Sequence, residues 1–399
     1  MIPRLKPYLT AHDWPSLFCR DAGLAAVFED RFAQLTGARY ALWLPYGRSA
    51  LYFFLKGYGL TQQEIIVPAY TCQSVIGPIK ETNNIPVFID SGPDDFNLDE
   101  HLLQGAVTDR TKAVIVAAMY GTPIDLDFYR TMKNRGIRLI GDYALGLLTF
   151  LTRQKDALDV FDLAFFSFGL GKEVSFLGGG ALITNNEEIY RRIKELRDQS
   201  CRPAPINRRV KGLLKFWGAY LLFRPEFYHL LYLLSEKSSL LDREKGLTMG
   251  VAHNLPEDFF YTPHPWQTKL ALDRLTRMDQ FILNKKDSLD YYYRRLAELA
   301  ELKPGLISWP KYCDSYSHLP VLVPPSARDS LLRFFLQHGI HSTVIFKKTL
   351  DKYYTGHLTF PQAQRYADGM AVLPLYYGIS LKVIDKVINT LQNWMSSGH

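Results

Sequence analysis

The stretch FSFGLGKEVSFLGGGALITN, residues 166–185, places one lysine, Lys172, between a serine-bearing apolar run and three consecutive glycines. The apolar runs at its two ends are typical of buried strands. The glycines at 178–180 let the backbone come close to a bulky group. An amine is a nucleophile only when it is unprotonated, and desolvation favours that state. The stretch is therefore either a surface loop with an incidental lysine or a site that buries a lysine so that it reacts.

Strand-like and helical patterns alternate around this stretch, from about residue 24 to 200. The strand-like runs are EIIVPAY (64–70), IPVFID (85–90), KAVIVAAMYG (112–121), RLIGDYA (138–144), LAFFSF (163–168) and GGALITN (179–185). The helical patterns are LAAVFEDRFAQLTG (24–37), SALYFFLKGYGL (49–60) and DLDFYRTMKNRG (125–136). Strands separated by helices predict an α/β fold, with a mostly parallel sheet covered by helices on both faces.

The pattern changes after residue 200 and predicts two further parts. We expect a large α/β domain over residues 1–210, an inserted aromatic-rich helical segment over 211–261, and a small α+β domain over 262–399. The small domain is expected to contain one long helix (266–299), a strand at LPVLVP (319–324) and a helix at RDSLLRFFLQHGI (328–340).

Composition favours a cytoplasmic protein that binds small anions. The net charge is +7, but the basic residues are spread along the chain, without a zinc finger, RNP-like segment or Arg-rich tail, so no nucleic acid is expected. The four cysteines lack metal-site or disulfide spacing, so no metal is expected and a reducing compartment is favoured. The N-terminal sequence MIPRLKPYLTAHDWP lacks the apolar core of a secretory signal.

Three other groups in the sequence, taken together with Lys172, match the parts of one kind of cofactor site. Asp142 ends an apolar strand, where its carboxylate could pair with a ring nitrogen. Ser167 and the turn GRSAL (47–51), which opens a helix, could both contact a phosphate, because helix N-termini favour anions. Arg48 in that turn either pairs with a phosphate or points to solvent. A reactive lysine, a ring-binding aspartate and a phosphate cup are the parts of a pyridoxal phosphate (PLP) site.

On these motifs the sequence resembles the DegT/DnrJ/EryC1/StrS family of fold-type-I PLP enzymes, which are mostly sugar aminotransferases. The resemblance runs from about residue 28 to 390 and also covers PVFIDSGPDDFNLD (86–99), QTKLALDRL (267–275) and LPLYYGIS (373–380). It implies that Lys172 is the catalytic lysine bonded to the cofactor and that Asp142 holds the pyridine nitrogen. Ser167 would bind phosphate with help from Arg48 and Ser49. Lysine rather than histidine at position 172 favours amino-group transfer over sugar dehydration.

Several positions depart from the family pattern. Cys72 stands where an aromatic side chain usually stacks on the cofactor ring, and Leu145 replaces a Gln or His. Ala118 replaces a histidine, and FYTP (260–263) replaces a segment that lends groups to the neighbouring subunit's site. Only His341 could serve as the usual small-domain histidine. These changes are expected to affect the binding of the amino donor and the acceptor more than the binding of the cofactor.

The segment RRVKGLLKFWGAYLLFRPEFYHLLYLLSEK (208–237) is too interrupted by charges and Pro225 to span a bilayer. It predicts two short helices that meet at Pro225. Basic flanks with aromatic-rich apolar faces suit a peripheral membrane contact through 208–234, at the inner face of the membrane. The alternative is burial in a homodimer interface, which fold-type-I enzymes generally have, or against the large domain.

Together these features predict a PLP-dependent aminotransferase. Its amino donor is expected to be glutamate, and its acceptor a keto-sugar on a nucleotide or lipid carrier, for polysaccharide or secondary-metabolite synthesis. The alternatives are other PLP-dependent chemistry at Cα, or a non-catalytic PLP-binding scaffold at a membrane.

Overall fold

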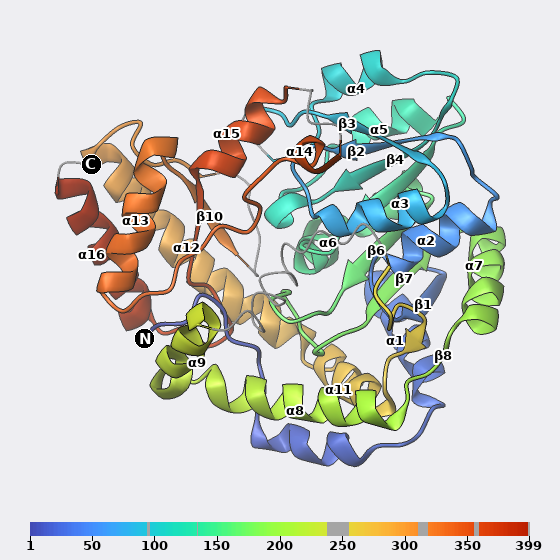
Figure 1. Ribbon diagram of the computed structural model, residues 1–399, viewed down its shortest axis with the longest axis horizontal. Coiled ribbons are helices and arrows are strands. Elements are labelled where there is room, and N and C mark those ends of the chain that lie inside the picture. The colour runs from blue at the N-terminus through green and yellow to red at the C-terminus, as the bar shows by residue number, and fades with distance from the viewer. Residues whose placement is uncertain (94–95, 134, 238–254, 310–317, 355–358, 398–399) are drawn as a thin grey trace.

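The computed structural model describes residues 1–93, 96–133, 135–237, 255–309, 318–354 and 359–397. Its centre is a seven-stranded sheet in the order β1-β7-β6-β5-β4-β2-β3 (Figure 1). The strands are β1 (Tyr40–Leu44), β2 (Glu64–Pro68), β3 (Ile85–Ile89), β4 (Thr111–Ala117), β5 (Arg138–Asp142), β6 (Leu163–Ser167) and β7 (Gly180–Thr184). The α/β class expected from the sequence is confirmed.

The sheet is parallel except at β7, which runs antiparallel to both β1 and β6. Parallel neighbours need a crossover connection, and the stretch 168–179 between β6 and β7 holds no helix, so β7 returns antiparallel. Strand β1 had no counterpart among the predicted strands. The loop that carries Lys172 is the connection between β6 and β7.

Helices cover both faces of the sheet, as predicted. One core cluster packs α1 (Leu24–Thr36), α5 (Leu126–Lys133) and α6 (Leu147–Arg153) against alternate strand residues. A second cluster packs α2 (Ser49–Gly57), α3 (Ile76–Glu81) and α7 (Glu187–Ser200) against the opposite face. The predicted helix over 24–37 is confirmed, and Gly37 ends it in the left-handed conformation with φ 74°.

The small domain packs helices around the antiparallel pair β10 (Leu319–Leu322) and β11 (Met370–Leu373). Its helices are α12 (Met278–Leu302), α13 (Pro325–Gln337), α14 (Asp351–Tyr354), α15 (Pro361–Gly369) and α16 (Leu381–Ser396). Residues 1–10, which we call the N-terminal strap, join this part of the chain, because Ile2 forms a parallel bridge with Ile340. The domain boundaries at 210 and 261 stay predictions.

The prediction of one helix over 266–299 is wrong, because α11 (Pro265–Leu275) and α12 are separate. The break between the two helices consists of Thr276 and Arg277. The Thr276 hydroxyl donates to the Asp273 carbonyl at 2.9 Å. Such a side-chain bond competes with the helical backbone bonds. Preceding the break, Arg274 is 1% exposed and forms a two-point ion pair with Asp13 of the short helix η1 (Ala11–Phe18).

The inserted segment forms the two helices predicted, α8 (Ile206–Leu222) and α9 (Pro225–Lys237). Phe216 and Ala219 on α8 pack with Leu177 of the lysine loop and with Trp266 and Leu270 of α11. Figure 1 shows α8 along the lower edge of the molecule and α9 beside the N-terminus. The short parallel pair β8 (Arg202–Pro203) and β9 (Tyr261–Thr262) joins the two ends of the insertion. Helix α4 (Glu100–Ala106) lies on the far side of the molecule from the insertion (Figure 1). Among the residues described, no helix has the length and apolarity needed to cross a membrane.

Asp13→Ala is expected to lower the free energy of unfolding by about 3–5 kcal/mol, because it leaves the Arg274 guanidinium buried without its partner. Glu187→Ala is the control, since the Arg191–Glu187 pair is exposed and should contribute less than about 0.5 kcal/mol. Urea unfolding followed by circular dichroism measures both. Equal effects of the two substitutions would contradict the role given to the buried pair.

Candidate active site

A cavity of about 730 Å³ lies where β5 and β6 end, between the sheet, the small domain and α8–α9. Five of the predicted site residues line it: Arg48, Cys72, Asp142, Ser167 and Lys172. The sixth, Ser49, is fully buried and is not part of the lining. The fold thus brings together residues that lie up to 124 positions apart in the sequence, from Arg48 to Lys172.

The lysine loop is held tightly at both ends. The Phe168 carbonyl accepts from the N–H groups of Phe176 and Gly178, and Lys172 N–H donates to the Gly169 carbonyl at 3.2 Å. The buried Glu173 carboxylate accepts from the Leu148 N–H in α6 at 2.9 Å. These bonds fix the direction in which Lys172 leaves the loop.

Asp142 ends β5, beside the strand that leads to Lys172, and is 6% exposed. Its Oδ1 accepts from the Ala144 N–H at 2.9 Å. Burial raises the pKa of Asp142 to about 6, although the Ala144 N–H and the Lys172 ammonium both lower it. A carboxylate this poorly solvated gains from a cationic or N–H partner in the cavity, such as a protonated ring nitrogen.

The turn 45–49 joins β1 to α2 and touches the start of β7. A Cβ on Gly180 would lie 2.1 Å from the Gly47 backbone nitrogen, so only glycine permits this approach. In the turn, Ser49 Oγ and Arg48 Nε are buried without hydrogen-bond partners. The Arg48 guanidinium lies 4.9 Å from the centre of the Tyr46 ring, and Arg48 lines the cavity, which favours the first alternative, pairing with a phosphate.

These observations fit a bound pyridoxal phosphate. A phosphate beside the turn would meet Arg48 and Ser167, which both line the cavity, whereas Ser49 Oγ lies buried behind the turn. Asp142 supplies a buried carboxylate for the ring nitrogen, and Lys172 supplies the amine on the neighbouring strand end.

The positions that depart from the family pattern fall into two groups. Cys72 and His341 line the cavity, and Cys72 Sγ lies 3.1 Å from Ser74 Oγ. Ala118 and Leu145 are buried in the two cores, and Phe260 packs on Tyr52 with ring centres 5.5 Å apart. Residues 261–263 line this chain's own cavity.

The sequence analysis did not predict the part of the cavity wall that comes from the N-terminal strap, α9 and the small domain. Arg4, Tyr228, Tyr232 and Thr343 line the same cavity as Lys172. Arg4 lies in an unremarkable stretch of sequence, and no periodicity or motif marks it. The aromatic residues of 208–234 did give a signal, which pointed to a surface rather than to the site.

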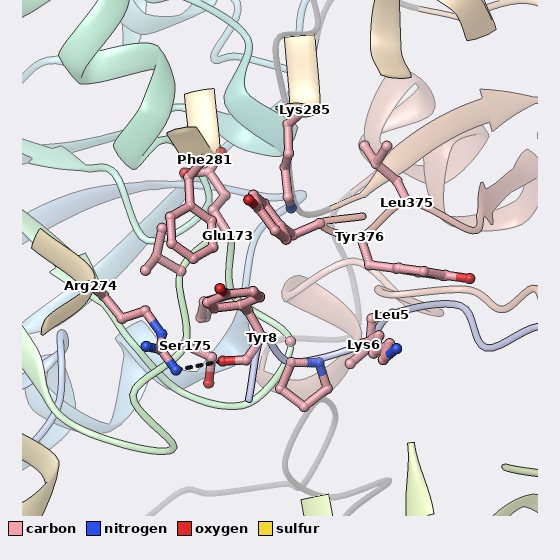
Figure 2. A pocket seen from close by; sticks show the side chains of 15 residues that line it. Leu5, Lys6, Tyr8, Glu173, Ser175, Arg274, Phe281, Lys285, Leu375 and Tyr376 are labelled. Carbon is pink, nitrogen blue, oxygen red and sulfur yellow. Dashed lines mark hydrogen bonds between the residues drawn. The ribbon is translucent and has the colours of Figure 1, made fainter. Parts of the chain in front are cut away.

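A second, smaller pocket lies behind the lysine loop (Figure 2). The strap residues Leu5 and Tyr8 line it together with Glu173 and with Lys285 of α12. Burial lowers the pKa of Lys285 to about 8, while the Glu173 carboxylate raises it. Figure 2 shows Arg274 reaching the Tyr8 carbonyl, at 2.8 Å, so the strap is anchored next to the loop.

Comparisons with solved structures show the same fold. NtdA from Bacillus subtilis, solved with bound cofactor PMP, has a TM-score of 0.74 at 18% identity, covering 98% of this chain and 83% of that one. PseC from Helicobacter pylori, an aminotransferase in pseudoaminic acid biosynthesis, has a TM-score of 0.74 at 16% identity, covering 98% of both chains. DesI, solved in the presence of its TDP-sugar product, has a TM-score of 0.71 at 22% identity, covering 97% and 88%.

The sheet, with its lysine and aspartate at neighbouring strand ends, defines a fold-type-I PLP-dependent aminotransferase. The chain belongs to the DegT/DnrJ/EryC1/StrS aminotransferase family, whose pattern matches residues 21–216 and 264–392. The unmatched stretch 217–263 contains α9 and the end of α8. The family resemblance predicted from the sequence is confirmed.

Asp142→Asn should make the cofactor-free protein more stable near neutral pH. The pKa of Asp142 in the folded state, about 6, exceeds the ordinary value of 3.8, because burial disfavours the ionised carboxylate. Ionisation of Asp142 therefore destabilises the folded protein progressively as the pH rises from about 4 through 6. The stability of the variant relative to wild type should therefore rise by about 3 kcal/mol as the pH rises from about 3 to 7.5.

Urea unfolding across that pH range measures the gain. Asp109→Asn, at an exposed aspartate, is the matched control and should show no such change. A stability difference between wild type and Asp142→Asn that does not vary with pH would contradict the burial of an uncompensated carboxylate.

Proposed function

We propose that this chain transfers an amino group from glutamate to a keto-sugar carried on a diphosphate, of either nucleotide or lipid type. The single observation that carries the proposal is the gathering of Arg48, Asp142, Ser167 and Lys172 around one cavity. The named likenesses to PseC and to the DesI complex with its TDP-sugar product support a sugar acceptor.

Each residue has a distinct role in this proposal. Pyridoxal phosphate, when bound, supplies an electron sink for the donor's Cα. Lys172 holds the cofactor between turnovers and, when its Nζ is free, moves the proton at Cα as general base and acid. Asp142 keeps a proton on the ring nitrogen through its buried carboxylate. Ser167 and Arg48 would bind the phosphate, with Ser49 buried behind them in the turn, and Cys72 would face the cofactor ring.

The charge of the cavity favours a phosphorylated acceptor. Its cationic lining residues are Arg4, Arg48, Lys172, Arg208, Lys211, Lys215 and Lys347, against the acidic Asp142 and Asp258. Such an excess of cations exceeds what one cofactor phosphate needs, and it attracts polyanionic ligands. The cations of α8 line the side of the cavity nearest the insertion, where the acceptor's diphosphate would lie.

The outer face of α8–α9 favours a lipid surface as the neighbour of this cavity. Large apolar side chains recur three or four residues apart and are exposed: Ile206, Val210, Leu214, Trp217 and Leu221 on α8, and Phe227, Leu230 and Leu233 on α9. We call this set the exposed stripe. Trp14 of η1 packs on Trp217 with ring centres 5.0 Å apart and extends it.

Charge complementarity favours a membrane over a second copy of the chain as the neighbour of the exposed stripe. Arg209 and Lys211 flank the exposed stripe on either side of the helix, and the chain is basic overall. Basic residues beside an aromatic-rich apolar stripe are typical of helices that lie on anionic membranes. We therefore propose peripheral contact of 208–234 with an anionic lipid surface, and homodimerisation through other faces.

The first experiment is the visible spectrum of the purified protein with PLP, before and after addition of L-glutamate. Wild type should show the band of lysine-bound cofactor, and glutamate should bleach it. Lys172→Ala should lack the band and lose at least about a thousandfold in amino transfer, because the covalent anchor and the proton carrier are the same amine.

Lys155→Ala, at an exposed lysine, is the control and should behave as wild type. A band that does not respond to glutamate would overturn glutamate as donor and favour other chemistry at Cα. A protein that never acquires a band would overturn the enzyme assignment.

Leu214→Asp is expected to reduce binding to anionic phosphatidylglycerol vesicles by at least about 30-fold, because about 2 kcal/mol of leucine burial is lost. Leu283→Asp is the matched control, since Leu283 is 61% exposed, close to the 66% of Leu214, but lies on α12. Co-sedimentation measures binding, and phosphatidylcholine vesicles should bind weakly.

Sedimentation velocity on the same variants tests the alternative neighbour. If Leu214→Asp converts a dimer to a monomer, the exposed stripe is a subunit interface and the membrane proposal is wrong. Equal vesicle binding by Leu214→Asp and Leu283→Asp would also contradict it.

A further inference from the structure

The N-terminal strap carries a cation, Arg4, into the cavity that holds Lys172. The Ile2 N–H donates to the Gly339 carbonyl at 2.8 Å, and the His341 N–H donates to the Ile2 carbonyl at 2.9 Å. The Arg4 carbonyl accepts from the Leu375 N–H at 3.2 Å. The strap is thus fixed to the small domain on both sides, and Arg4 has a defined position.

The Arg4 guanidinium lines the cavity without a carboxylate partner among the residues that the structure describes. Burial lowers the pKa of Arg4, and the Tyr228 hydroxyl raises it. Burial lowers the pKa of His318, and the charges of Arg4, Lys172 and Lys285 lower it further. A group of cations in a poorly solvated site needs an anion.

The polar neighbours of Arg4 do not supply that anion. The Tyr228 hydroxyl accepts from the Arg4 backbone N–H and lies 2.6 Å from His341 Nδ1. Burial raises the pKa of Tyr228 to about 12, and burial with Arg4 lowers the pKa of His341 to about 3. Both groups are therefore neutral at physiological pH. They fix the strap against α9 and leave the charge of Arg4 uncompensated.

Two other cations of the cavity already have protein partners. Arg208 forms ion pairs with Glu257 and Asp258, and Lys215 Nζ donates to the Leu177 carbonyl at 3.3 Å. Arg48 lies in the turn assigned to the cofactor phosphate. Arg4 and Arg48 both line the cavity with Lys172 and form no ion pair within the described part of the chain, and Arg4 is the one that lies outside the phosphate turn.

We propose that Arg4 binds the carboxylate of the amino donor. The inference rests on the proposed function, in which the donor's amine must reach the place of Lys172 while its negative charge is paired inside the cavity. A guanidinium presents two parallel N–H groups that match a carboxylate. A phosphate of the acceptor's carrier has the same oxyanion chemistry, so the experiment must separate the two sources.

Calorimetric titration of the holoenzyme with glutarate, a dicarboxylate, and with uridine diphosphate makes this separation. Arg4→Gln should weaken glutarate binding by about 10- to 100-fold and change the affinity for uridine diphosphate by no more than about twofold. Arg4→Lys should recover part of the loss. Lys6→Gln is the matched control, because Lys6 is an exposed cation of the same strap outside this cavity.

A second readout follows the bleaching of the visible band by L-glutamate. In Arg4→Gln, the half-saturating glutamate concentration should rise by the factor seen with glutarate, while the maximal rate changes by less than about threefold. Thermal unfolding midpoints close to that of wild type would show that the variants are folded.

Three results would overturn the inference: glutarate affinity that does not change in Arg4→Gln, no glutarate binding by wild type, or a loss confined to uridine diphosphate. The last would assign Arg4 to the carrier phosphate. These outcomes differ from failure of the proposed function, in which the wild-type holoenzyme shows no glutamate-sensitive band. Calorimetry measures glutarate binding by its heat and does not depend on a change in that band.

Discussion

The contact on which the site depends is the approach of β7 to the turn before α2, where Gly180 meets the Gly47 backbone without a side chain between them. Because β7 returns antiparallel to β6, the connecting loop must reverse within residues 168–179. This reversal places Lys172 beside the end of β5, which carries Asp142. A bulkier residue at position 180 would separate the turn from the lysine loop, and the phosphate-binding groups from the amine.

The site contains buried charged groups whose charges the surrounding residues do not fully neutralise. Burial raises the pKa of Asp142 and lowers the pKa of Arg4, so both groups would be better solvated outside the fold. Ligands that bring a ring nitrogen, a phosphate and a carboxylate supply the missing partners. Stability comes from elsewhere, from two apolar cores and from the buried Arg274–Asp13 pair that anchors the strap.

The inserted helices connect the inside of the site to the surface of the molecule. Phe216 of α8 packs against Leu177 of the lysine loop, while Tyr228 of α9 reaches Arg4 and His341. The opposite face of the same helices carries the exposed stripe.

The sequence by itself determined the α/β class, the helices on both faces, the two helices meeting at Pro225 and the residues grouped with Lys172. Strand runs, glycines and proline report local backbone preferences, which do not depend on distant partners. Only the tertiary structure decided the break after Leu275, the inward position of Arg48 and the entry of Arg4 into the cavity. Arg4 lies 168 residues before Lys172, and its place depends on strap pairing at Ile340 and on Tyr228, contacts between distant segments that no local pattern records.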